Sequence, residues 1–139
     1  MSEAPATVLG FDFGTRRIGV AIGQTLTGTA RPLTTLRARE GQPDWREVAR
    51  LLDDWRPQAF VVGLPVHMDG REHARTAAAR RFGNRLHGRF GLPVIWIDER
   101  LSSEEAERQL REAGGDTGEV DAVAAQLIVQ SWLDRHPGS

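Results

Sequence analysis

The sequence predicts an α/β fold in which a mixed five-stranded sheet carries helices on both faces. The chain begins with two apolar segments joined by a short polar turn, which is typical of an antiparallel hairpin. After these segments, apolar runs of strand length alternate with stretches of helical periodicity, which favours parallel strands connected by helices. A length of 139 residues suits one compact domain, so residues 1–139 are expected to form a single domain.

Three strands are expected near the N-terminus. Residues 7–13 (Thr-Val-Leu-Gly-Phe-Asp-Phe) form an apolar run that ends at Gly14-Thr15, and residues 17–24 form a second apolar run. Their short separation predicts a tight turn and therefore a hairpin. A third strand is expected at Thr29–Leu36.

Helices and strands then alternate through the middle of the chain. Asp44 is a candidate N-cap for a helix that runs to about Trp55, because apolar residues recur there at helical spacing. Ala59–Gly63 is a short, nearly continuous apolar run, as expected of a strand that is covered on both faces. A helix is expected over His73–Phe90 and a further buried strand over Pro93–Ile97.

Two helices are expected at the C-terminal end. Ser102 and Glu105 have the spacing of a capping box, which predicts a short helix through Ala113 that ends at Gly114-Gly115. The last helix is expected to begin near Glu119, because apolar residues after this position recur on one helical face.

The composition excludes several classes of chemistry. The chain has no cysteine, which excludes disulfides, thiolate nucleophiles and cysteine-ligated metals. All 18 basic residues are arginine, so a lysine-dependent phosphate loop and Schiff-base catalysis are excluded as well. No apolar run approaches the roughly 18 residues of a membrane span, and no secretory signal is evident, so the expected location is cytoplasmic. With a net charge of −1, any nucleic-acid surface would be a local arginine patch.

Acidic residues lie near the expected ends of several elements. Asp12 is placed between two phenylalanines near the end of the first strand, Asp98 and Glu99 follow the fifth strand, and Asp121 lies in the expected first turn of the last helix. Each has an ordinary structural explanation when taken alone. Asp12 would cap a turn, Asp98 and Glu99 would be solvated beside Arg100, and Asp121 would complement the helix dipole.

Taken together, these acids predict a metal site. Sites in such sheets lie at the carboxyl ends of the parallel strands, and the expected strand order brings the strand ends together beside the last helix. The small Ala124-Ala125 pair is expected to let that helix approach the sheet closely. Converging carboxylates repel one another unless cations are bound, and oxygen ligands suit Mg²⁺ or Mn²⁺. Two such ions about 4 Å apart could activate a water and stabilise the leaving oxygen in phosphodiester hydrolysis.

Longer motifs resemble those of the YqgF/RuvX family, in the same order and over nearly the whole chain. The resemblance is carried by Gly10-Phe-Asp-Phe-Gly-Thr-Arg-Arg-Ile-Gly-Val-Ala-Ile-Gly23, Val61-Val-Gly-Leu-Pro65 with Met68-Asp-Gly70, Arg89-Phe-Gly-Leu-Pro-Val94 leading into Asp98-Glu-Arg-Leu-Ser-Ser103, Val120-Asp-Ala-Val-Ala-Ala125, and Gln130-Ser-Trp-Leu-Asp134.

The resemblance implies a ribonuclease H-like fold related to Holliday-junction resolvases. It also implies a nuclease that matures the 5′ end of pre-16S ribosomal RNA. The acidic residues of the family fall on Asp12, Glu99 and Asp121, which are therefore the expected catalytic and metal-ligating residues. Side chains alternate across a strand, so Asp98 is expected to point away from Glu99 and is kept as a supporting partner. One departure is the segment 114–120, which lacks the basic residues usual in the family and casts doubt on a nucleic-acid contact there.

Arginines supply the candidate nucleic-acid contacts. Arg16 and Arg17 occupy the hairpin turn next to Asp12, where they could bind a substrate phosphate. A second group follows helical spacing, for which a solvated helix face is the commoner structural explanation. The expected nucleic-acid-binding residues are Arg16, Arg17, Arg100, Arg81 and Arg85.

The expected function is a nuclease that uses Mg²⁺ or Mn²⁺ to cut structured nucleic acid, with processing of the 5′ end of pre-16S rRNA as the expected role. Two alternatives stay open: a Holliday-junction resolvase, and a module that binds RNA, ribosome or polymerase without cutting. The Asp12-Phe-Gly-Thr15 turn also resembles the first phosphate loop of actin-like ATPases, but those proteins need a second domain that 139 residues cannot supply. Structure-selective cutting generally requires two sites, so a homodimer is a further expectation.

Overall fold

The computed structural model describes residues 5–65, 74–98 and 117–135 and confirms the predicted mixed α/β architecture. The expected helix over Ser102–Ala113 lies outside these residues. In chain order, the elements are β1 (Thr7–Asp12), β2 (Arg17–Gln24), β3 (Thr29–Arg39), β4 (Gln42–Pro43), α1 (Trp45–Trp55), β5 (Ala59–Leu64), α2 (Ala74–Phe90), β6 (Val94–Asp98) and α4 (Thr117–Arg135).

The sheet has the strand order β4-β3-β2-β1-β5-β6. Strands β1, β2 and β3 pair antiparallel, whereas β5 pairs parallel with both β1 and β6, as the alternation of strands and helices predicted. The expected number of five strands is wrong by one, because β3 continues to Arg39 and the chain then turns back. Glu40 and Gly41 form this turn with φ angles of 53° and 80°, which lets Gln42–Pro43 pair with the end of β3.

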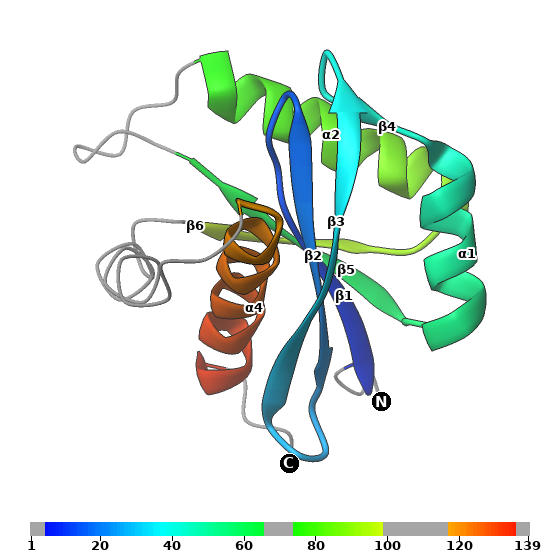
Figure 1. Cartoon of the computed structure of the whole chain (residues 1–139). Coiled ribbons are helices and arrows are strands. Elements are labelled where there is room, and N and C mark those ends of the chain that lie inside the picture. Colours follow the sequence, from blue (N-terminus) through cyan, green and yellow to red (C-terminus); the bar gives the residue numbers. More distant parts are fainter. Residues whose placement is uncertain (1–4, 66–73, 99–116, 136–139) are drawn as a thin grey trace.

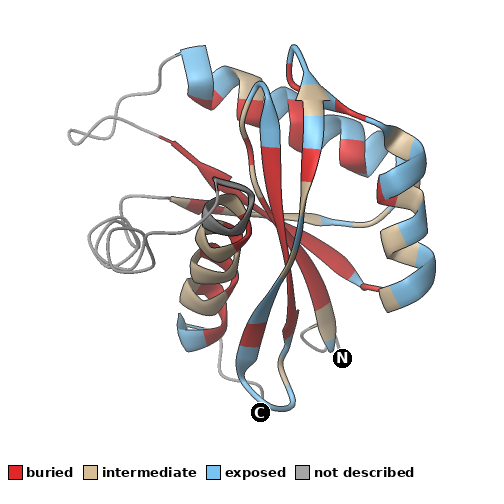
Figure 2. Ribbon diagram, viewed as in Figure 1, coloured by how far each residue is buried: buried red, intermediate tan, exposed pale blue. Residues whose placement is uncertain are grey.

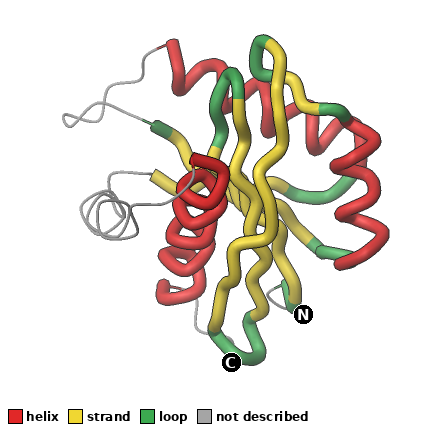
Figure 3. Tube along the Cα trace, in the orientation of Figure 1, coloured by secondary structure: helices red, strands yellow, loops and turns green. Residues whose placement is uncertain are grey.

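Helices cover both faces of the sheet, with α1 and α2 on one side and α4 on the other (Figures 1 and 3). Alternation along β1 separates two apolar cores. Leu9 and Phe11 belong to the core under α1 and α2, whereas Val8 belongs to the core under α4. Figure 2 shows the central strands buried beneath both layers. None of the helices in the described part of the chain combines the length and apolar character that a membrane crossing requires.

Helix α1 begins and ends at the predicted positions for identifiable local reasons. Asp44 is the N-cap, and its side chain accepts a hydrogen bond of 3.0 Å from the backbone N–H of Arg46. At the other end, Arg56 adopts a left-handed conformation with φ 48° and donates its backbone N–H to the carbonyl of Leu52. Val48 is fully buried in the sheet-facing side of the helix.

Helix α4 lies unusually close to the sheet, and glycines of the sheet make this possible. A Cβ atom built on Gly10 would lie 2.0 Å from Cγ2 of Val129, and one built on Gly19 would lie 1.8 Å from the carbonyl oxygen of Asp121. Side chains at these strand positions would therefore push the helix away. The expectation that Ala124-Ala125 gives this closeness is only half right, because Ala125 is buried whereas Ala124 is not.

Candidate functional site

Asp12 and Asp121 lie at the same end and on the same face of the sheet. Asp12 is the last residue of β1 and is paired with Gly19 of β2. Residues directly opposite each other in a β-ladder point to the same face of the sheet. Gly19 is also the residue that the backbone carbonyl of Asp121 contacts. The first strand and helix α4 therefore bring Asp12 and Asp121 to the same end and the same face of the sheet.

Asp121 is not in the first turn of its helix, contrary to the sequence-based expectation. Helix α4 begins at Thr117, so Asp121 is its fifth residue and lies more than one turn of 3.6 residues from the start. The stabilising effect of the helix dipole on an acid falls off within the first turn. Stabilisation by the helix dipole therefore explains the position of Asp121 less well than expected from the sequence, which placed this residue in the first turn.

Arg17 forms an ion pair with Asp121. Its Nε atom lies 3.0 Å from Asp121 Oδ2, and the side chains are 49% and 22% exposed, respectively. Although the two atoms are close, Oδ2 is buried and accepts no well-aligned hydrogen bond from the described residues. The contact is therefore electrostatic without good hydrogen-bond geometry, and it leaves a buried anionic oxygen with unused acceptor capacity.

The surroundings of Asp121 raise its pKa above the ordinary value for an aspartate. Burial is the main cause, because it disfavours the charged form, whereas the neighbouring Arg17 guanidinium acts in the opposite direction. One arginine thus does not fully compensate the cost of keeping this carboxylate ionised. A closely bound divalent cation would compensate it more completely.

Asp98 ends β6 on the opposite face of the sheet. Asp98 is paired with Leu64 of β5, and Leu64 belongs to the core under α1 and α2. Trp96, which lies two residues before Asp98 on the same strand, packs against this core as well. The predicted ligand Glu99 follows Asp98 and lies outside the described residues, as does Arg100.

The strand that carries Asp98 is not a direct neighbour of β1. Strand β5 lies between them, which separates β1 from β6 by two strand spacings, or roughly 10 Å. On the α4 face of β5, the residue between the two strand ends is Gly63, which is buried.

The described residues fit a divalent cation in part. Within residues 5–65, 74–98 and 117–135, no group of three or more histidines or acids could hold a metal ion. Two carboxylates are present, however, and Asp121 contributes a buried oxygen with no well-aligned hydrogen-bond donor among the described residues. Hard oxygen ligands of this kind suit Mg²⁺ and Mn²⁺ rather than softer metals. Asp12 and Asp121 form the described part of such a site.

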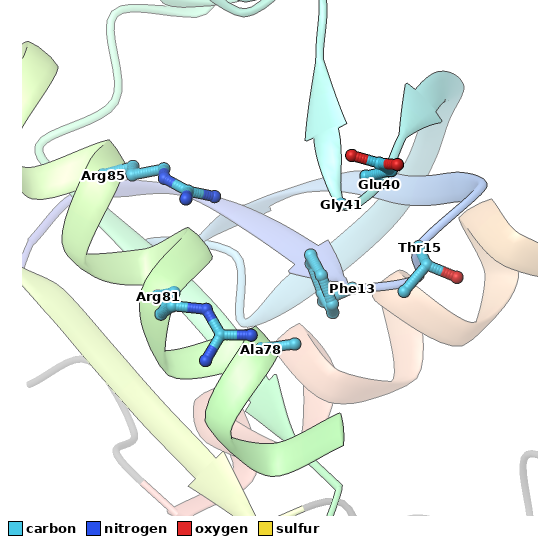
Figure 4. Close-up of a pocket in the computed structure, with 7 residues that line it drawn as sticks. All are labelled: Phe13, Thr15, Glu40, Gly41, Ala78, Arg81 and Arg85. Atoms are coloured by element: carbon cyan, nitrogen blue, oxygen red, sulfur yellow. The ribbon is translucent and has the colours of Figure 1, made fainter. Parts of the chain in front are cut away.

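The helical arginines divide into two environments. Arg81 and Arg85 of α2 line a pocket together with residues of the β1–β2 and β3–β4 turns, as Figure 4 shows. Arg89, one turn further along the helix, instead lies over the ring of Trp45 at 4.4 Å from its centroid. The apolar side predicted for this helix is confirmed, because Phe82 and Leu86 are fully buried.

The pocket was not identified from the sequence. Its remaining lining residues come from three separate segments: Phe13, Thr15, Glu40, Gly41 and Ala78. The available signal was a Glu-Gly pair between two strand segments, which is typical of a tight hairpin. Recognising that signal would have required placing β4, whose two residues are too few to show strand periodicity.

We expect Arg17 and Arg16 to have separable roles, although they are adjacent in the sequence. Arg17→Ala should lower the free energy of unfolding at neutral pH by about 1–3 kcal/mol, because Asp121 would keep a buried charge without its cation. The loss should shrink as the pH falls below the pKa of Asp121, where the carboxyl is neutral. Thermal unfolding as a function of pH measures this effect.

Arg16→Ala is the matched control. Arg16 is exposed, so its removal should leave the unfolding profile unchanged. It should instead weaken nucleic-acid binding and lower the slope of log affinity against log salt by about 1, as expected for one lost phosphate contact. If Arg17→Ala unfolds with the same pH profile as Arg16→Ala, the ion pair contributes nothing to the fold.

Comparisons with known proteins agree with this architecture. The profile of a family described as "RuvX: Holliday junction resolvase" matches residues 6–135. A protein of Pectobacterium carotovorum subsp. carotovorum (strain PC1), named "Putative pre-16S rRNA nuclease", is 57% identical over 132 residues, which cover 92% of this chain and 95% of the relative. The similarity therefore extends over almost all of both chains.

Solved structures show the same fold at low sequence identity. A Thermus thermophilus RuvC, determined in complex with a Holliday-junction substrate, superposes with a TM-score of 0.54 at 19% identity and covers 96% of this chain and 98% of its own. The yeast mitochondrial Holliday junction resolvase Ydc2 gives a TM-score of 0.57 at 10% identity, with coverage of 95% and 80%. These likenesses establish a ribonuclease H-like arrangement of sheet and helices.

Proposed function

Because the chain belongs to the RuvX family, we propose that it is a divalent-metal-dependent nuclease acting on structured nucleic acid, with the 5′ end of pre-16S rRNA as its substrate. The observation that carries this proposal is the placement of Asp12 and Asp121 on one face of the sheet, with Asp121 Oδ2 buried and poorly satisfied. Phosphodiester hydrolysis is the reaction that paired carboxylates and divalent cations support in this kind of site.

The chain's own residues take distinct parts in the proposed reaction. Asp12, Asp121 and Glu99 would hold Mg²⁺ or Mn²⁺, which supplies an activated water and stabilises the leaving oxygen. Arg17 forms an ion pair with Asp121 in the metal-free protein, and exposed Arg16 lies on the same turn, where it would bind a substrate phosphate. The close approach of α4 over Gly19 holds the Asp121 backbone in register with the end of β1.

The proposal is tested by cleavage of a labelled RNA that contains the 5′ region of pre-16S rRNA. We expect cutting with Mn²⁺ or Mg²⁺, none with a chelator, and a loss of at least about 100-fold in the Asp12→Asn variant, since a ligand should matter at least as much as the residues supporting it. Asp53→Asn is the matched control, because Asp53 is exposed on α1. Equal activity in Asp12→Asn and Asp53→Asn would favour a non-catalytic binding module instead.

Resolution of Holliday junctions is the second candidate, favoured by the shared fold with RuvC. A junction presents two strands for cutting, so this activity would call for a homodimer with two sites. The same experiment on a labelled four-way DNA junction, together with sedimentation of the protein alone and with the junction, separates the two substrates. A monomer that cuts the RNA and spares the junction supports the ribosomal role.

A further inference from the structure

The pocket beside α2 combines features that suit a nucleotide. It has a volume of about 370 Å³, within the range of small-ligand sites. Figure 4 shows Arg81 and Arg85 extending along one side of it, Glu40 on the opposite side, and the ring of Phe13 between them. The pocket thus offers cations, a carboxylate acceptor and an aromatic wall within one small volume.

The two arginines in this pocket are available to bind an anion. No acid of the described residues forms an ion pair with Arg81 or Arg85, including Glu40 in the same pocket. The guanidiniums are one helical turn apart on exposed positions of α2, so both can reach the same ligand. Planar guanidinium groups bind phosphate oxygens in a bidentate manner, which makes a phosphate the best-matched anion.

The aromatic wall is held in a fixed position. Phe13 is 6% exposed, and its ring centroid lies 5.3 Å from that of Phe82 in the core. On its other side, Gly41 comes so close that an added Cβ would lie 3.0 Å from the ring. The ring therefore presents only a small, rigid apolar edge to the pocket, which a nucleobase can contact but on which it cannot stack.

Glu40, which lines the pocket, has a backbone conformation that is unfavourable for glutamate. It is the first of two turn residues with positive φ, at 53°, a position where asparagine, aspartate or glycine is preferred. Such conformations carry a cost in stability and occur preferentially at functional sites. Asparagine would suit the turn better but would shorten the side chain, so the choice of glutamate is consistent with a role in the pocket.

The pocket and the carboxylate site share one short segment. Phe13 directly follows Asp12, and alternation sends the two side chains to opposite faces at the same end of the sheet. Thr15, which lines the pocket, is followed immediately by exposed Arg16. A strand of nucleic acid that crosses the β1–β2 turn would pass from one site to the other along Arg16.

We propose that this pocket holds one unpaired nucleotide of the substrate strand. Arg81 and Arg85 bind its phosphate, the base packs against Phe13, and Glu40 accepts a hydrogen bond from an amino group of the base. This inference rests on the proposed nuclease function and adds that the substrate is single-stranded next to the bond that is cut. Cytosine presents an amino group that a carboxylate can accept from, whereas uracil presents a carbonyl oxygen at the same place.

Binding of mononucleotides to the metal-free protein tests the pocket without any cleavage. We expect cytidine 5′-monophosphate to shift the backbone amide NMR signals of Thr15, Gly41 and Arg85, and to bind at least severalfold more tightly than uridine 5′-monophosphate. Ribose 5-phosphate and inorganic phosphate, which lack the base, should bind at least tenfold more weakly. The Arg81→Ala/Arg85→Ala variant should lose binding, and Arg50→Ala/Arg135→Ala, which removes two exposed arginines elsewhere, should retain it.

Glu40→Asn separates recognition from folding. This variant should be at least as heat-stable as the wild type, because asparagine suits the turn, and it should no longer distinguish cytidine from uridine monophosphate. Equal binding of ribose 5-phosphate and cytidine monophosphate, or no binding at all, overturns the nucleotide pocket. An RNA that is cut normally by the Arg81→Ala/Arg85→Ala variant also overturns it while leaving the nuclease proposal intact. If the protein binds nucleotides but cuts no substrate, the nucleotide pocket is supported and the proposed nuclease function is contradicted.

Discussion

Asp121→Asn is expected to reduce cleavage at least about 100-fold while leaving the metal-free protein as stable as the wild type, or more stable, at neutral pH. The loss of activity follows if Asp121 is a metal ligand. Even removal of residues that only support metal ligands typically lowers metal affinity or activity about 10–100-fold. The gain in stability follows from its burial and from the absence of a well-aligned donor to Oδ2 among the described residues. Arg17 is half exposed, so water can solvate it once its partner is gone.

The pH dependence distinguishes this explanation from a general effect of the substitution. Because the pKa of Asp121 is raised in the folded protein, the folded state binds a proton more readily than the unfolded state does. The wild type therefore loses stability as the pH rises from the unfolded pKa of the carboxyl through its folded pKa. Asp121→Asn has no such group, so its advantage in melting temperature should appear above this window and disappear below it.

Three measurements check this prediction: the melting temperature without metal from acidic to neutral pH, the heat of Mn²⁺ binding, and the cleavage rate with Mn²⁺. Asp53→Asn on α1 should match the wild type in all three. A destabilised but fully active Asp121→Asn protein would show that the residue serves the helix and not the reaction. Unchanged Mn²⁺ binding would contradict its role as a ligand.

The sequence was informative wherever a pattern is repeated over several residues. The hairpin, the strand at Ala59 and the long helices have apolar periodicity over several residues, and the structure confirms each of them. Strand β4 has two residues and no periodicity, so it could not be found by this means. The separation of β1 from β6 by β5 is a property of the sheet order, which depends on packing between distant segments.

The candidate site was predictable in its residue types more than in its geometry. An aspartate inside an apolar strand signals an unusual role, and Asp12 does lie on the face that α4 covers. The pairing of Arg17 with Asp121 was not predictable, because it joins residues more than 100 positions apart across a helix–sheet contact. The closeness of α4 depends on Gly10 and Gly19, whose importance becomes visible only when the opposing atoms are known.

The adjacent acids Asp98 and Glu99 offer the sharpest test of the proposed ligand set. Asp98 lies on the face of β6 that Trp96 shares with the α1–α2 core, away from Asp12 and Asp121. Glu99 lies outside the described residues, and the alternation expected from the sequence makes it the predicted third ligand. Glu99→Gln should therefore reduce cleavage at least about 100-fold, whereas Asp98→Asn should reduce it at most about tenfold.

The two variants serve as controls for each other, since they are neighbours and each removes one negative charge. Calorimetric titration with Mn²⁺ should show heat for Asp98→Asn and little for Glu99→Gln, which separates ligand loss from a defect in substrate binding. Melting temperatures without metal confirm that both proteins are folded. The reverse order of effects would mean that the chain turns at the end of β6 and that Asp98 is the ligand. Equal and small losses in both variants would mean that the carboxylates of Asp12 and Asp121 hold the cation without a partner from this strand.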